Sequence, residues 1–211
     1  MINRRKSLAL LSVLTVSLQS CSSPPIDISY LIDRSGSSEN DKHFQESRHK
    51  VCEAIIAKLE RGDKFGLVPV TGEIPLLENL QSANPTIVRK QCHQPVKTSK
   101  PGTLSCPAFL IAKKQFEEPS SGTPVLISQV QVNETEKPCP EIWRSTAELV
   151  FKRGGSVLIL NSTNGGGNNF RPELEAAFAG LPVQYSHENP AITVNKLIEE
   201  TRRRAEVKNA K

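Results

Sequence analysis

From residue 26 onwards, short runs rich in β-branched residues alternate with longer segments whose apolar residues recur at helical spacing. A strand, a helix and a second strand in succession require a crossover connection, which favours a mostly parallel sheet covered on both faces. The sequence therefore predicts a doubly wound α/β domain over residues 26–211. The expected strands are 26–32, 64–71, 72–80, 123–132, 155–161 and 181–186, and the expected helices are 39–60, one after Thr103, 141–152, 170–179 and 191–207. The strand 72–80 is expected to fold back through a tight turn at Thr71-Gly72, as one antiparallel edge strand.

A separate segment precedes this domain. Residues 1–20 have a basic start followed by an apolar run, Leu8 to Leu18, that is shorter than the ~20 residues needed to span a bilayer. This layout is typical of an export signal. The end of the segment, Leu18-Gln19-Ser20-Cys21, resembles the lipobox of bacterial lipoproteins.

The lipobox resemblance implies cleavage before Cys21 and lipidation of its thiol. Residues 21–25 would then be the lipidated cysteine and a short linker, and the domain would be tethered to a membrane of the bacterial cell envelope, on its periplasmic or outer-membrane side. The alternative is an ordinary secretory signal cleaved nearby, with Cys21 an incidental thiol.

The export signal also accounts for most of the net charge. The formal net charge is +5, and three of the positive charges, Arg4, Arg5 and Lys6, lie in this segment, which leaves +2 for the remainder. A nearly balanced chain has no electrostatic footprint for nucleic acid. We therefore expect no nucleic-acid partner.

The stretch Tyr30-Leu-Ile-Asp-Arg-Ser-Gly-Ser-Ser lies where the first strand ends. Ligands of doubly wound sheets bind beyond the carboxyl ends of the strands. Asp33, Ser35 and Ser37 occupy alternate positions there, and Gly36 permits a tight turn. One carboxylate and two hydroxyls suit a hard cation such as Mg²⁺. Alternatively, Asp and Ser at such a turn simply cap the following helix.

The Asp-x-Ser-x-Ser pattern resembles the metal-ion-dependent adhesion site of von Willebrand factor type A domains, and the resemblance covers residues 26–207. Gly102-Thr103 matches the Gly-Thr pair that opens a later helix in that family. The resemblance implies that Asp33, Ser35, Ser37 and Thr103 hold Mg²⁺ or Mn²⁺. It also implies that an acidic residue of a protein partner completes the coordination.

The sequence departs from the family at the end of the fourth strand. There the family has a Thr-Asp-Gly whose Asp helps to hold the metal, and Gln129 or Gln131 occupies its place here. A neutral amide makes the site less anionic, which weakens the binding of the metal. Glu134 or Glu136 is an alternative source of the missing carboxylate.

Four cysteines remain besides Cys21, an even number that favours disulfides in an exported protein. Three pairings are possible. Cys92 and Cys106 bracket the loop that carries Thr103, and a bridge between them would fix that loop. Cys52 has the position of an ordinary buried thiol. A metal cluster that uses His93 is a further possibility, although its spacing matches no zinc pattern.

Three functions follow from these observations. The first is a membrane-anchored protein-binding module that acts through a divalent cation. The second is a metal-free structural or assembly lipoprotein of the same fold. The third is a hydrolase that uses Ser35 or Ser37, but the sequence shows no catalytic arrangement of Ser, His and Asp, so we expect the protein not to be an enzyme.

Overall fold

The computed structural model describes residues 23–94, 102–130, 137–160, 172–186 and 189–210. The export segment and Cys21 therefore lie outside the described residues, as do Gln131, Glu134 and Glu136. The strands are β1 (Ile26–Asp33), β2 (Lys64–Val70), β3 (Gln81–Ser82), β4 (Thr123–Gln129), β5 (Ser156–Leu160) and β6 (Gln184–Ser186). The helices are α1 (Gly36–Asn40), α2 (Lys42–Ala57), α3 (Pro85–His93), α4 (Ser105–Glu117), α5 (Pro140–Lys152), α6 (Pro172–Ala177) and α7 (Pro190–Asn209).

The strands form one sheet in the order β3-β2-β1-β4-β5-β6. Neighbouring strands are parallel except β2 and β3, which are antiparallel. The chain runs from β1 towards one edge and then from β4 towards the other, so the order reverses between β1 and β4. This is the place where doubly wound sheets bind ligands. The predicted fold class is confirmed.

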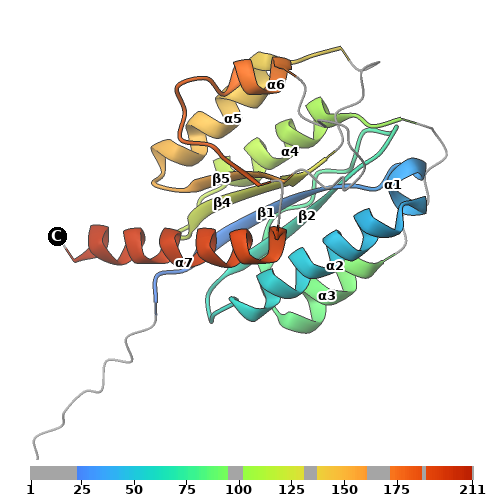
Figure 1. The fold of residues 1–211 in the computed structure, drawn as a ribbon. Helices are drawn as coiled ribbons and strands as arrows, with labels where there is room; N and C mark the ends of the chain where they lie inside the picture. Colours follow the sequence, from blue (N-terminus) through green and yellow to red (C-terminus); the bar gives the residue numbers. More distant parts are fainter. Residues whose placement is uncertain (1–22, 95–101, 131–136, 161–171, 187–188, 211) are drawn as a thin grey trace, which may run out of the picture.

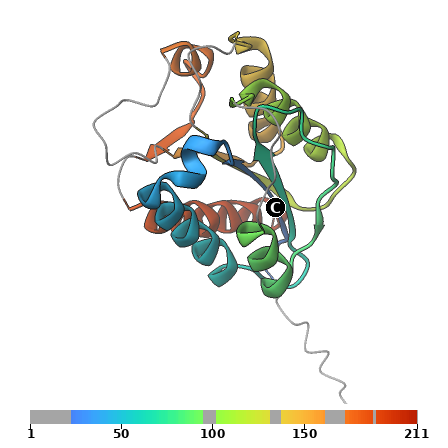
Figure 2. The same cartoon turned by 90° about the vertical axis from the view of Figure 1, so that its right-hand side faces the viewer.

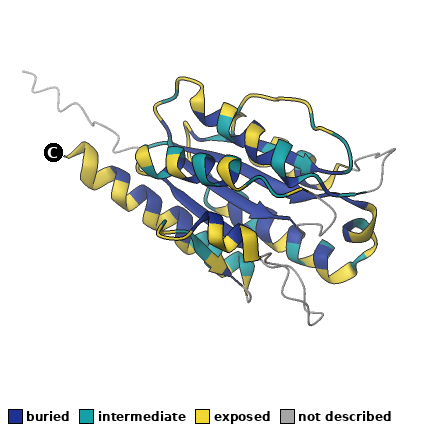
Figure 3. Cartoon of the chain, turned by 90° about the horizontal axis from the view of Figure 1, so that it is seen from above, coloured by how far each residue is buried: buried dark blue, intermediate teal, exposed yellow. Residues whose placement is uncertain are grey.

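The sheet separates two layers of helices (Figures 1 and 2). β1 shows why both faces are covered, because its side chains alternate between them: Tyr30 and Ile32 pack into a core with α2, α3 and α7, whereas Leu31 packs into a second core with α4, α5 and α6. Every residue of β1 is buried. Figure 3 shows the buried strands between helices whose outer sides are exposed.

Short-range capping sets where several helices begin. The predicted helix 39–60 is split, because the Asp41 carboxylate accepts hydrogen bonds from the backbone N–H groups of His43 and Phe44 and so starts α2 anew after α1. Asn84 caps α3 in the same way, and Pro85 follows it at the first helical position. Among the described residues, none of the helices is both long and apolar enough to span a membrane.

The prediction for residues 72–80 is wrong. This segment contains no strand, and Ile74, Leu76 and Leu77 are 73%, 85% and 50% exposed, so they do not pack on the sheet. The chain instead reaches the far end of β2, where Gln81 of β3 pairs with Phe65. The antiparallel edge strand therefore exists, but it is only two residues long and lies after the predicted segment.

Candidate functional site

The turn after β1 gathers three of the predicted metal ligands. β1 ends at Asp33, which pairs with Val70 of β2, and the backbone N–H of Arg34 donates to the Val70 carbonyl at 2.8 Å. The chain then turns back, so that the Ser35 N–H donates to the Asp33 carboxylate at 2.8 Å. The hydroxyl oxygens of Ser35 and Ser37 lie 3.0 Å apart. The structure thus brings Asp33, Ser35 and Ser37 together.

The residues of this turn differ in how deeply they are buried. Asp33 and Ser35 are buried, whereas Ser37 is exposed. Ser38, which the sequence pattern did not single out, has its hydroxyl 3.1 Å from Asp33 Oδ1 and 2.9 Å from the Ser35 carbonyl oxygen. The buried Ser38 therefore helps to hold the Asp33 carboxylate in place.

Thr103 reaches the same edge of the sheet from another loop. The backbone N–H of Leu104 donates to the carbonyl of Thr71 at 2.9 Å, and Thr71 directly follows the last residue of β2. Gly102 has a φ of +116°, a left-handed conformation that favours glycine, and a Cβ there would lie 3.8 Å from Gly72 Cα. The loop thus contacts the residues that directly follow β2. Thr103 is buried and lies two residues before α4.

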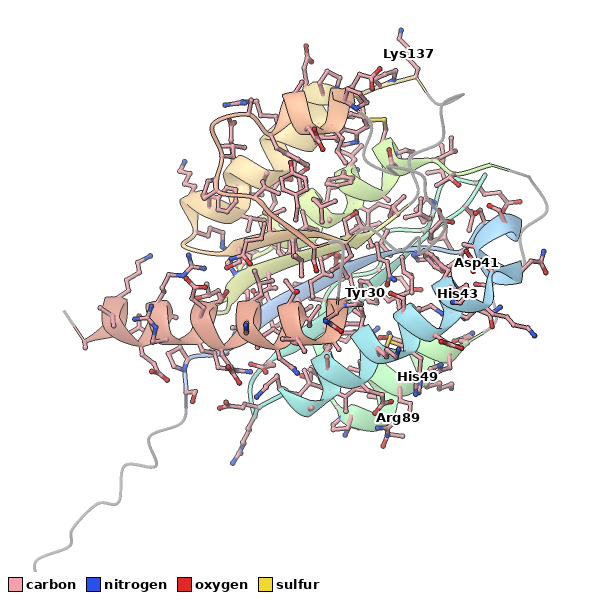
Figure 4. All side chains as sticks on the ribbon, viewed as in Figure 1. Tyr30, Asp41, His43, His49, Arg89 and Lys137 are labelled. Atoms are coloured by element: carbon pink, nitrogen blue, oxygen red, sulfur yellow. A yellow bond between two sulfur atoms is a disulfide. The ribbon has the colours of Figure 1, made fainter. Side chains whose placement is uncertain are left out.

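Gln129, at the end of β4, uses its side chain in hydrogen bonds to neighbouring residues. Its Oε1 accepts a hydrogen bond from the Tyr30 hydroxyl, and its Nε2 donates to the Ser47 hydroxyl of α2 at 2.9 Å. Burial raises the pKa of the Tyr30 phenol, which keeps the donor protonated. Figure 4 labels Tyr30, which belongs to β1 in the sheet. The amide thus bridges β1 and α2 at the carboxyl end of β4, where Gln129 is one of the two residues expected in place of a metal-binding carboxylate.

Arg34 anchors the turn to α3. Its side chain is 1% exposed, Nη1 donates to the Cys92 carbonyl at 3.3 Å, and Nη2 donates to the Gln94 carbonyl. Nε lies 3.1 Å from a carboxylate oxygen of Glu39, which also pairs with Arg48 at 2.7 Å. Burial is the main cause that lowers the pKa of Arg34, and these acceptors supply the pairing that a buried cation needs.

The residues at this edge fit a hard divalent cation. Carboxylate and hydroxyl oxygens are the ligands that Mg²⁺ prefers, and octahedral coordination at about 2.1 Å places adjacent oxygens roughly 3.0 Å apart. The Ser35 and Ser37 oxygens have this separation. The nearby acidic residues Glu39 and Asp41 are engaged elsewhere, with the arginines and with the α2 backbone. Asp33 contributes its carboxylate to this turn, where the Ser35 N–H and the Ser38 hydroxyl orient it.

The disulfides correct the expected pairing. Cys92 is bonded to Cys52, not to Cys106, and Cys106 is bonded to Cys139. The physical reason is the sheet itself: Cys52 and Cys92 lie in the core on the α2 side, whereas Cys106 and Cys139 pack against the core on the other side. Cys52 is therefore not a free thiol. The Cys106–Cys139 bond ties the start of α4, three residues after Thr103, to the start of α5.

No family model and no curated protein sequence matches the chain. Solved structures do match. A von Willebrand factor type A protein from Catenulispora acidiphila superposes with a TM-score of 0.60 at 16% identity, over 86% of this chain and 43% of that one. BatB, a conserved hypothetical protein from Bacteroides thetaiotaomicron, gives 0.60 at 15% identity, over 84% and 99%.

A third match is the VWA domain of SpRpn10, with a TM-score of 0.53 at 13% identity, over 83% of this chain and 94% of that domain. Identities this low are evidence for the fold alone. The chain therefore has a von Willebrand factor type A-like fold, as the Asp-x-Ser-x-Ser pattern implied.

Proposed function

We propose that this protein is a membrane-anchored protein-binding module that binds an acidic residue of a partner through a divalent cation, Mg²⁺ or Mn²⁺. Asp33, Ser35, Ser37 and Thr103 hold the cation, and its open coordination position accepts the partner's carboxylate. The observation that carries the proposal is the convergence of Asp33, Ser35 and Ser37 at the switch point of a type A-like sheet.

The surface beside the site supports binding of a protein rather than of a free ion alone. A pocket of about 400 Å³ opens next to β2, and the exposed Ile74 and Leu76 line it together with Thr71. Thr71 follows Val70, the strand partner of Asp33. Exposed apolar side chains next to a polar site are typical of protein interaction surfaces.

The export prediction fits this role. Disulfides persist in oxidising compartments outside the cytoplasm, and the structure contains Cys52–Cys92 and Cys106–Cys139. Anchoring through Cys21 would keep the domain at the membrane surface, since two or more acyl chains hold a protein stably.

A cation titration tests the metal part of the proposal. Calorimetric titration of Mg²⁺ and Mn²⁺ into residues 22–211, which include the whole sheet and both helix layers, is expected to show saturable binding. Asp33→Asn should abolish it, because the amide keeps the hydrogen bonds from Ser35 and Ser38 but removes the charge. Asp41→Asn is the matched control: it lies in the same stretch, and asparagine caps α2 as aspartate does.

A second experiment tests the partner. Envelope proteins retained on the immobilised domain in Mg²⁺ should be released by a chelator and should not be retained by Asp33→Asn.

The alternative function is a metal-free assembly lipoprotein, and the observation that favours it is Gln129, whose amide is used by Tyr30 and Ser47. Retention that is insensitive to both chelator and Asp33→Asn would support it. A catalytic role is not part of either proposal. Among the described residues, the hydroxyls of Ser35 and Ser37 contact each other, the Ser35 hydroxyl also contacts Ser38, and neither contacts a histidine.

A further inference from the structure

A second group of metal-binding side chains lies away from the Asp33 turn, on the outer side of α2 and α3. His49 and Glu53 are four residues apart on α2 and so share one face of that helix. His93 is the last residue of the neighbouring α3. One ligand atom from each of the three residues lies within 4.8 Å of the other two. Figure 4 labels His49 on this face, with Arg89 close by.

The spacing of the two imidazoles fits one metal ion. Nδ1 of His49 and Nε2 of His93 are 3.3 Å apart. In a tetrahedral zinc site with Zn–N bonds of 2.0–2.1 Å, two nitrogen ligands are separated by roughly 3.3 Å. The exposure of both histidines leaves room for a fourth ligand, either water or a group from another molecule.

The cluster is also held in place before any ion binds. The Cys52–Cys92 disulfide joins the two helices through the residues next to Glu53 and His93, with the Cα atoms 6.3 Å apart. Ligands that are already ordered lose less entropy when they bind.

We propose that His49, Glu53 and His93 form a second metal site, for a transition-metal dication of the zinc class. Two imidazoles and a carboxylate are ligands of zinc rather than of Mg²⁺. The site is therefore chemically distinct from the oxygen-only site at Asp33, and it does not depend on that site being functional.

Arg89 is a competitor for one ligand. Its Nε and Nη2 donate to the two carboxylate oxygens of Glu53 at 2.9 and 2.8 Å, and this hydrogen bonding is the main cause that lowers the pKa of Glu53. Without a metal, Glu53 and Arg89 thus form an ion pair beside the imidazoles of His49 and His93, whose ring planes are tilted by 45°. Zinc must draw the carboxylate away from Arg89 or share it.

An ion here would also act on the candidate site. His93 lies between Cys92 and Gln94, whose carbonyls accept the hydrogen bonds from Arg34. Zinc would fix this end of α3 to α2, and Arg34 links the same end of α3 to the turn that carries Asp33.

The test is a titration of Zn²⁺ into residues 22–211 in competition with a chromophoric chelator. We expect one strongly bound ion, and Co²⁺ in its place should show the absorption of tetrahedral coordination. His49→Gln and His93→Gln should each weaken binding by roughly tenfold or more, since even the loss of an outer partner of a ligand has that effect. His43→Gln, an exposed histidine on the same helix, is the matched control and should bind as the wild type does.

Two further variants sharpen the result. Arg89→Gln should tighten zinc binding, because it frees the carboxylate and removes a positive charge, and an unchanged affinity would take Glu53 out of the ligand set. Asp33→Asn should leave zinc binding intact while it abolishes Mg²⁺ binding, which keeps the two sites separable. Equal zinc affinity in the wild type and in both His49→Gln and His93→Gln would overturn the proposal.

Discussion

The two helix layers hold the two halves of the candidate site by different means. On the α2–α3 side, the Asp33 turn is fixed by the buried Arg34, which donates to two carbonyls at the end of α3. On the α4–α5 side, the contacts of the described residues that place Thr103 are the backbone hydrogen bond from Leu104 to Thr71 and the nearby Cys106–Cys139 bond. The first half should therefore keep its shape when cross-links are removed, and the second should not.

Removal of each disulfide tests this difference directly. The bonds close similar spans, with sequence separations of 40 and 33 residues, so replacing either pair by alanine should lower the free energy of unfolding by about 3–4 kcal/mol. Mg²⁺ affinity should separate them: it should fall in Cys106→Ala/Cys139→Ala and stay unchanged in Cys52→Ala/Cys92→Ala. Urea denaturation and calorimetry measure the two quantities. Equal losses of Mg²⁺ affinity would contradict the comparison.

Arg34→Leu should destabilise the other half of the candidate site, the Asp33 turn. The substitution removes a buried cation from two carbonyls and from Glu39, which should lower the free energy of unfolding by about 3 kcal/mol. Lys58→Met is the control, because its ion pair with Glu199 is on the surface, and such pairs contribute about 0.5 kcal/mol or less. Denaturation curves that coincide for the two variants would show that Arg34 is not the anchor.

Tyr30→Phe tests whether Gln129, at the end of β4, takes part in the cation site. Loss of the hydroxyl leaves the buried Gln129 oxygen without its donor, which should lower the free energy of unfolding by about 1–2 kcal/mol. Mg²⁺ affinity should not change, because Gln129 belongs to the packing between β1 and α2. A marked change in calorimetry would place Gln129 in the site after all.

Ser38→Ala is expected to have the smallest effect on stability, about 1 kcal/mol, since it removes one hydroxyl that contacts Asp33 and the Ser35 carbonyl. Mg²⁺ affinity should fall roughly tenfold, because an outer partner that orients a ligand is lost. Calorimetry checks this, and an unchanged affinity would mean that Ser35 alone orients the carboxylate.

The sheet could be predicted because its long strands are rich in β-branched and other large apolar residues, as in β1, where both faces are buried. The short elements could not. β3 is the polar pair Gln81–Ser82, which has no strand pattern, and α3 has only two buried residues, Val88 and Cys92. The apolar residues of 72–80 predicted a strand because a sequence does not show that they stay exposed.

The site residues were likewise predictable from the sequence only in part. Asp33, Ser35 and Ser37 could be grouped in advance, since they lie within five residues of each other and follow a strand. The disulfides could not be paired, because chain order does not show which face of the sheet a cysteine meets. His49 and His93 are 44 residues apart, and only the packing of α2 on α3 makes them neighbours.

The most direct test of the central claim is paramagnetic broadening by Mn²⁺ in the amide NMR spectrum of residues 22–211. One ion held by both halves should broaden the signals of Ser35 to Ser37 and of Gly102 and Thr103 together, and Asp33→Asn should remove the effect. Broadening confined to one half, or found only around His49 and His93, would contradict the claim that the Asp33 turn and the Thr103 loop form one cation site.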